Sequence, residues 1–117
     1  MTGYQRLEIN EAGTVTVVRL RDKRIVEEVV IRELAKELFQ LVEVEGRGRL
    51  LLDFSSVDSL SSAAVANLIA LHKKVTAQGG VLKLSNIGSG IREVFVITKL
   101  DRLFDIRADR EQALAAF

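Results

Sequence analysis

The residues best placed to do chemistry are the serines between Asp53 and Ala64, which follow an apolar run and precede a helix-like segment. The first turn of a helix has unpaired backbone N–H groups and a partial positive charge, so it accepts an anion readily. A serine at this place has two interpretations. It is either a helix N-cap, whose hydroxyl accepts a backbone hydrogen bond, or a phosphorylation site, where a phosphate adds about −1.5 to −2 units of charge.

Other chemical arrangements are weak or missing. The chain has no cysteine, which excludes a thiolate nucleophile, an iron–sulfur cluster and Cys-ligated zinc. Its one histidine, His72, lies on the apolar side of a predicted helix, which favours a partly buried structural role. Asp53 and Asp58 could hold a cation loosely, but loop carboxylates are usually solvated or act as caps. The residues from Gly88 to Gly90 lack the third glycine of a dinucleotide-binding loop. We therefore expect no catalytic residue, no cofactor and no metal.

The charge balance limits the class of partner. The 117 residues carry 17 Lys and Arg against 16 Asp and Glu, a net charge of +1, whereas a nucleic-acid-binding face needs an excess of basic residues. Arg21, Lys23 and Arg24 form a small basic cluster near Arg19, which is either a contact for an acidic partner surface or an ordinary solvated loop.

Composition and hydropathy indicate a globular domain rather than a disordered or membrane-spanning chain. Hydrophobic residues make up 48% and charged residues 28% of the sequence. The N-terminus has no signal-peptide pattern. The longest apolar run, 63–71, is interrupted by Asn67 and is far too short to span a membrane. We expect a single domain, residues 1–117, located in the cytoplasm, with no direct nucleic-acid contact and no membrane span.

The elements that must position the serines alternate between strands and helices. A hairpin is predicted over 6–20 with its loop at 11–13, followed by a charged connection at 21–24 and a long helix that begins near Glu27 and ends before Gly46. An apolar strand, 50–54, precedes a polar loop and a helix over 62–77. Further elements follow in the order strand 81–85, a helix opened by 88–90, strand 103–106 and a terminal helix capped by Asp109. This alternation predicts an α/β fold with a mainly parallel or mixed sheet.

The helix over 62–77 has two contrasting faces. Its predicted core face contains the apolar residues and the histidine: Val65, Leu68, Ile69, His72 and Val75. Its opposite face contains small residues and one lysine: Ala63, Ala66, Ala70, Lys74 and Ala77. Exposed alanines either reflect helix propensity or allow another protein to approach the helix closely.

The motifs in the second half of the chain are similar to those of a known family. An Asp-containing apolar strand (51–54), a loop valine (Val57) and a helix ending at 79–80 occur in order, and the late segment 93–104 combines Val-Phe, Thr, Leu-Asp and a final Phe. On these residues, the segment from 50 to 106 resembles the STAS domain of bacterial anti-sigma factor antagonists. In that family, Asp-Ser-Ser/Thr-Gly-Leu-Gly enters the helix. Here Ser61 replaces the motif Asp, and Ala63–Ala66 replaces the residues after the serine.

The resemblance implies a fold and a function. The fold is a STAS-type mixed sheet of four to five strands, with helices packed mainly on one face. The protein is then not an enzyme: it binds an anti-sigma factor with serine kinase activity, and a PP2C-type serine phosphatase can reverse phosphorylation. Counting without gaps places Ser62 on the family's phosphorylated serine, with Ser61 as second choice. The implied partner-binding residues surround it: Asp58, Ser61, Ser62, Ala63, Ala66, Ala70 and Lys74.

Two alternatives differ in class from this switch. The missing motif Asp leaves open a constitutive, non-phosphorylated STAS interaction module, such as a scaffold or a subunit of a transporter or signalling complex. A small α/β enzyme or nucleotide-binding domain is disfavoured, because the sequence lacks cysteine and a phosphate-binding loop.

Overall fold

Leucine-rich and β-branched segments form the central sheet of the computed structural model, which describes residues 3–117. Its strands are β1 (Leu7–Ala12), β2 (Val15–Leu20), β4 (Arg49–Asp53), β6 (Val81–Ser85) and β7 (Asp105–Arg107). They lie in the order β1-β2-β4-β6-β7. The pair β1–β2 is antiparallel and the other neighbours are parallel, which confirms the predicted mixed sheet.

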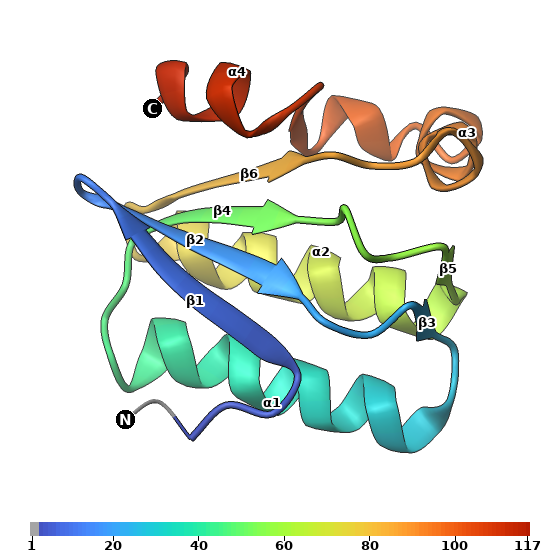
Figure 1. Ribbon diagram of the computed structural model, residues 1–117, viewed down its shortest axis with the longest axis horizontal. Helices are drawn as coiled ribbons and strands as arrows, with labels where there is room; N and C mark the ends of the chain where they lie inside the picture. The colour runs from blue at the N-terminus through green and yellow to red at the C-terminus, as the bar shows by residue number, and fades with distance from the viewer. Residues whose placement is uncertain (1–2) are drawn as a thin grey trace.

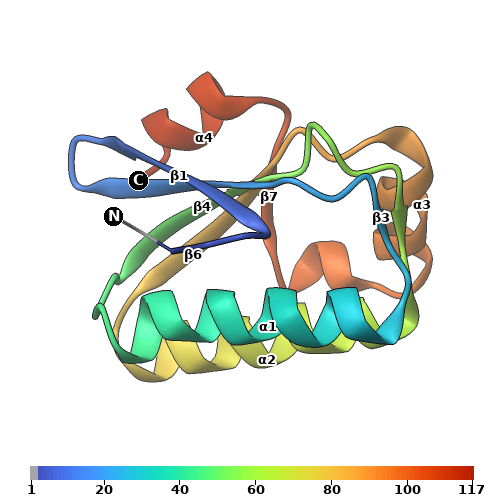
Figure 2. The ribbon, with the colours of Figure 1, turned by 60° about the horizontal axis from the view of Figure 1, so that its bottom comes forward.

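Helices cover both faces of this sheet unequally. The helices are α1 (Glu28–Glu43), α2 (Ser62–Ala77), α3 (Ser89–Ile97) and α4 (Arg110–Ala115), with a short 3-10 helix η1 (Leu100–Arg102). Figure 1 and Figure 2 show α1 and α2 side by side on one face, while α4 lies on the opposite face. The prediction that the helices pack mainly on one face is therefore confirmed, and α4 is the element on the other side.

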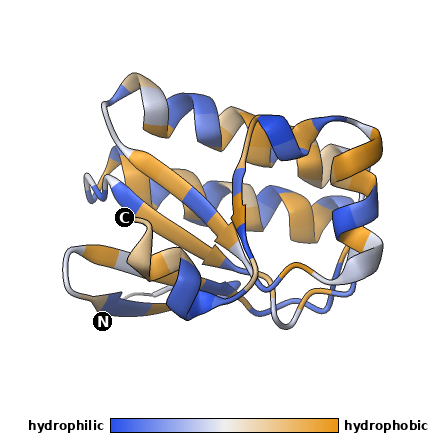
Figure 3. Ribbon diagram, turned by 90° about the horizontal axis from the view of Figure 1, so that it is seen from above, coloured by the Kyte–Doolittle hydropathy of each residue, from blue (hydrophilic) through white to orange (hydrophobic). Residues whose placement is uncertain are grey.

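The central strand β4 joins the two sides of the core. Leu50, Leu51 and Leu52 are each fully buried. Leu50 and Leu52 belong to the large cluster under α1 and α2, whereas Leu51 packs with Ala113 of α4 on the other face. Figure 3 shows the resulting mainly hydrophobic strands between helices of mixed hydropathy. The prediction of a strand buried on both faces is confirmed, as expected for a parallel strand between helical layers.

Two connections contain structure that the sequence did not predict. Residues Arg24–Ile25 form β3 and residues Ser59–Leu60 form β5, and these two short strands pair in parallel.

The hairpin loop is also shorter than predicted, because β1 and β2 remain paired up to Ala12 and Val15. Gly13, with φ +63°, supplies the left-handed conformation of this tight turn.

The carboxyl end of α2 is tied closely to the sheet. The N–H of Val81 donates to the carbonyl of Gly48 at 2.7 Å. A Cβ on Gly80 would lie 2.4 Å from that same carbonyl oxygen, so only glycine fits there. Gly79 adopts φ +77° and ends the helix. The predicted stop at the Gly-Gly pair thus has a physical basis in close backbone packing.

Candidate functional site

The two serines at the amino end of α2 have different surroundings. Ser61 is the N-cap, and its hydroxyl accepts a hydrogen bond from the N–H of Ala64 at 3.2 Å. Ser62 is the first helical residue and is exposed. Among residues 3–117, no group forms a hydrogen bond with its hydroxyl. Ser62 therefore presents an unengaged hydroxyl beside the unpaired N–H groups of a helix start.

The strands β3 and β5 fix the segment that leads into this helix. Ile25 of β3 is fully buried and pairs with Leu60 of β5. The carbonyl of Ile25 accepts a hydrogen bond from the N–H of Ser61 at 3.0 Å, and the carbonyl of Lys23 accepts one from the N–H of Asp58 at 2.7 Å. Sequence reasoning missed this support because a two-residue strand has no periodicity to detect.

The two loop carboxylates serve separate structural contacts. One oxygen of Asp53 accepts hydrogen bonds from the N–H of Ser55 at 2.9 Å and from the amide of Asn86 at 3.0 Å. Asp58 is exposed and lies 3.5 Å from the ammonium of Lys23. Within residues 3–117, no group of three or more His, Cys, Asp or Glu side chains could hold a metal ion. The arrangement therefore gives no support to a cation site at these two residues.

The outer face of α2 is lined by small side chains. Ala63, Ala66 and Ala70 are exposed, in agreement with the predicted face. Lys74 is only partly exposed, because its ammonium pairs with Glu43 of α1 at 2.9 Å. An alanine surface permits close approach of another backbone and carries little charge to desolvate.

The inner face of α2 differs in detail from the prediction. Val65, Leu68 and Val75 are buried as expected, but Ala64 and Leu71 complete the buried face. Ile69 and His72 are only partly buried at its side. The rings of His72 and Phe104 pack in a T-shaped arrangement at a centroid distance of 5.4 Å, which supports the predicted structural role of His72.

A groove of about 250 Å³ opens beside the start of α2. Its lining combines residues of the β5 region, α2 and α3: Asp58, Ser59, Leu60, Val65, Gly90, Ile91, Val94 and Phe95. Ile91 and Phe95 of α3 are buried, whereas Val94 is 46% exposed. Val96 and Ile97 of α3 are also exposed. Apolar surface therefore adjoins the serine end of α2.

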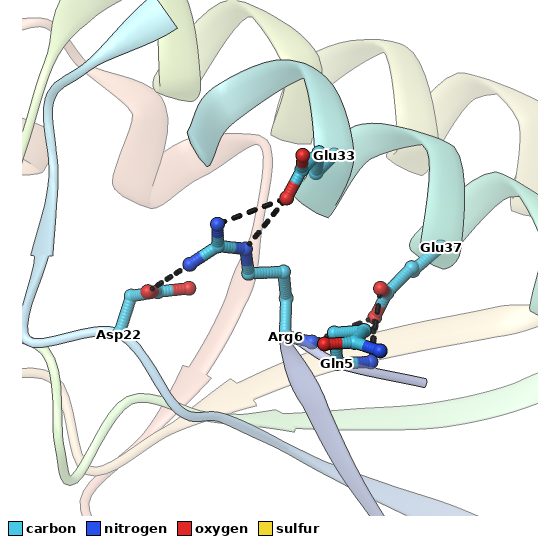
Figure 4. A network of polar contacts seen from close by, with 5 residues as sticks. All are labelled: Gln5, Arg6, Asp22, Glu33 and Glu37. Atoms are coloured by element: carbon cyan, nitrogen blue, oxygen red, sulfur yellow. Dashed lines mark hydrogen bonds and ion pairs between the residues drawn. The ribbon is translucent and has the colours of Figure 1, made fainter. Parts of the chain in front are cut away.

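A second hollow, of about 380 Å³, lies along α1 and is built differently. There the backbone N–H groups of Gln5 and Arg6 donate to the carboxylate of Glu37, and the Arg6 guanidinium bridges Asp22 and Glu33 (Figure 4). Burial and the hydrogen bond to Glu45 raise the pKa of Tyr4 to about 12. Because these polar groups bind one another, this hollow anchors the N-terminal segment and is a poor candidate for a ligand site.

Comparison with known proteins agrees with this geometry. The STAS domain family model matches residues 6–113. BtrV of Bordetella bronchiseptica, a protein assigned as an anti-sigma factor antagonist, is 33% identical over 85 residues, which cover 73% of this chain and 72% of that protein. No helix in residues 3–117 is long and apolar enough to cross a membrane.

Solved structures show the same fold at lower identity. An assigned anti-sigma factor antagonist of Thermotoga maritima has a TM-score of 0.85 at 18% identity, covering 97% of this chain and 95% of that one. The phosphorylated form of the Bacillus cell fate determinant SpoIIAA has a TM-score of 0.70 at 15% identity, covering 94% of this chain and 97% of that one. With the family model matching nearly the whole chain, the protein belongs to the STAS domain family.

Proposed function

We propose that this protein is an anti-sigma factor antagonist whose binding is controlled by phosphorylation of Ser62. The observation that carries the proposal is the exposed, unengaged hydroxyl of Ser62 at the amino end of α2, next to a serine that already caps the helix. The relative BtrV, assigned to the same activity, supports the partner class. The partner is an anti-sigma factor with serine kinase activity.

The physical basis of the switch is a change of charge on a surface that carries little charge. The first turn of α2 contains no acidic residue, and Ser61 stands where the family motif has Asp. A phosphate on Ser62 adds about −1.5 to −2 units of charge. The helix end stabilises the free phosphoprotein, but burying that charge against a partner requires its desolvation. Phosphorylation therefore disfavours the complex.

The proposed contact surface extends from β5 along the outer face of α2. It contains the residues Asp58, Ser61, Ser62, Ala63, Ala66, Ala70 and Lys74. The adjoining groove, with Leu60 and Val94 in its wall, offers apolar area to the same partner. The STAS domain acts in the cytoplasm as a binding switch rather than as an enzyme. A PP2C-type serine phosphatase resets it.

The experiment that tests this function uses an anti-sigma kinase encoded in the same genome. The wild-type protein and the variants Ser62→Ala and Ser61→Ala are incubated with the kinase and ATP, and intact mass is measured. We expect one phosphate on wild type and on Ser61→Ala, and none on Ser62→Ala. Calorimetry with Ser62→Asp should show weakened binding. Absence of phosphate on both serines, together with wild-type affinity of Ser62→Asp, would overturn the proposal.

A second function is favoured by one specific departure from the family motif. Ser61 replaces the acidic residue beside the phosphorylated serine, which is compatible with a constitutive STAS interaction module in a scaffold, transporter or signalling complex. In that case the kinase would leave Ser62 unmodified. A stable complex with another assembly would then form equally well with wild type and with Ser62→Asp.

A further inference from the structure

We propose that Arg21, Lys23 and Arg24, together called the basic edge, dock an acidic surface of the protein partner. The proposal rests on the proposed function, because the basic edge lies beside Ser62, and it specifies the chemistry of the surface that the partner presents there.

Asp22 is oriented inward, away from the three cations of the basic edge. In sequence, this carboxylate stands among the three cations and would partly neutralise them. In the structure, it accepts a hydrogen bond from the Arg6 guanidinium at 2.7 Å, and its side chain is only 19% exposed (Figure 4). The same guanidinium is held from its other side by Glu33. The carboxylate of Asp22 therefore binds Arg6 within the domain and adds little negative charge to the outer surface.

The cations are oriented in the opposite way. The Lys23 side chain is 76% exposed. Arg21 and Arg24 are exposed, and neither forms an ion pair with any of the residues 3–117. Ile25, the next residue, is fully buried and fixes the chain through β3. The basic edge is thus held on a paired strand and its flanking turn.

The basic edge is joined directly to the start of α2. Arg24 pairs with Ser59 in the β3–β5 ladder, and the carbonyl of Ile25 accepts the N–H of Ser61. Asp58 is the carboxylate in contact with the basic edge, through Lys23, and Glu27 at the start of α1 is the next acid along the chain. The excess of positive charge is small. A phosphate of about −1.5 to −2 units at Ser62 would cancel or reverse it.

A protein surface fits this patch better than a nucleic acid. The net charge of the chain is only +1, and a nucleic-acid groove needs basic residues spread along the backbone path. The groove beside the basic edge has apolar walls, and its lining includes Asp58, which pairs with Lys23, and Ser59, which pairs with Arg24. An apolar centre with a charged rim is typical of protein–protein interfaces.

The first experiment measures the association rate with the anti-sigma kinase at low and high salt. Arg24→Glu and Arg21→Glu are compared with Arg110→Glu, a matched charge reversal at the exposed start of α4 on the other face of the sheet. Electrostatic steering predicts a fall of about tenfold for each basic-edge variant at low salt, which shrinks at high salt, and no change for Arg110→Glu. Equal rates for Arg24→Glu and Arg110→Glu would overturn the proposal.

The second experiment does not depend on the kinase. The ¹⁵N-labelled protein is titrated with an acidic Glu/Asp peptide, with its Gln/Asn counterpart and with a single-stranded oligonucleotide of equal charge. We expect amide shifts at 21–25 and 58–62 with the acidic peptide alone. Equal shifts with the neutral peptide, or stronger shifts with the oligonucleotide, would overturn the proposal. A kinase that fails to bind wild type would count against the proposed function, while the peptide titration would still decide the basic edge.

Discussion

Helices α1 and α2 have the same length of 16 residues and pack side by side on one face of the sheet. The side chains on their outward faces nevertheless differ in chemistry. The outer side of α1 carries Glu33 and Glu37, which bind Arg6 and the backbone of the N-terminal segment. The outer side of α2 carries exposed alanines. The N-terminal segment of the chain therefore covers part of α1, at Glu33 and Glu37, whereas the alanine face of α2 stays open to another molecule.

The amino ends of the two helices also differ, in their caps and in the charge of their first turns. The N-cap of α1 is Glu27, which forms no capping hydrogen bond, and Glu28 places negative charge in the first turn. The first turn of α2 has a serine cap and no acid. Negative charge near a helix start offsets its positive end. The end of α2 is thus left more receptive to an added anion than the end of α1.

The largest expected effect comes from adding bulk and charge to the open helix. Ala66→Arg places a long cation on the outer face of α2 and should weaken kinase binding by about 30-fold, as expected when a central contact is lost. Isothermal titration calorimetry measures this loss. The matched variant Gln40→Arg puts the same side chain on the outer side of α1 and should bind like wild type. Equal losses in both variants would contradict the contrast between the helices.

A change on α1 should affect stability instead of binding. Glu37→Ala removes the acceptor for the N–H groups of Gln5 and Arg6 and should lower the free energy of unfolding by about 1–2 kcal/mol. Urea denaturation measures the loss, and hydrogen exchange should accelerate at both amides. Lys36→Ala, an exposed neighbour, should stay within about 0.5 kcal/mol of wild type. Unchanged exchange at residues 5 and 6 would argue against this anchoring role.

The two serines at the start of α2 should differ in their contribution to stability. Ser61→Ala removes the hydroxyl that accepts from Ala64 and should cost about 1 kcal/mol of stability. Ser62→Ala removes an unengaged hydroxyl and should change stability by less than about 0.5 kcal/mol. Thermal unfolding of both variants tests this order. A larger loss of stability for Ser62→Ala than for Ser61→Ala would contradict the assignment of Ser61 as the helix cap.

The smallest expected effect is a pH dependence at the α1 side. The pKa of Tyr4 is raised from 10.0 to about 12 by burial and by the hydrogen bond to Glu45. A raised folded-state pKa contributes stability below pH 10, and this contribution is lost as the pH rises towards 12. Tyrosinate absorbance reports the titration directly, because the chain has one tyrosine and no tryptophan. Glu45→Gln should shift the midpoint downward, and an unshifted midpoint would exclude the contact as a cause.

Local signals explain which parts of the fold could be predicted from sequence. The bounds of α2, 62–77, agree with the prediction because a serine cap and a Gly-Gly stop are both encoded beside the helix. The pair β3–β5 was missed because its strands are two residues long and are stabilised by partners 35 residues away, such as Ser59 for Arg24. Short-range patterns contain no information on such pairing.

The features of the candidate site also differ in whether they could be predicted from sequence. The exposed alanines were predicted, since helical periodicity determines which side chains share a face. Ser62 was selected by its position in the resemblance to the STAS motif. The inward orientation of Asp22 depends on Arg6, and the exposure of Val94 depends on α3 burying only Ile91 and Phe95. Both require tertiary contacts. The orientation of the charges around the site therefore emerged only with the fold.

The pairing of β3 with β5 makes the proposed surface a discontinuous epitope. A linear peptide copied from residues 21–25 or from 58–62 contains only part of the contacts and loses conformational entropy when it is ordered. Neither peptide should compete effectively with the intact domain. An inhibitor that mimics this protein must therefore join both segments on a rigid scaffold, and recognition by the partner should vanish in step with global unfolding.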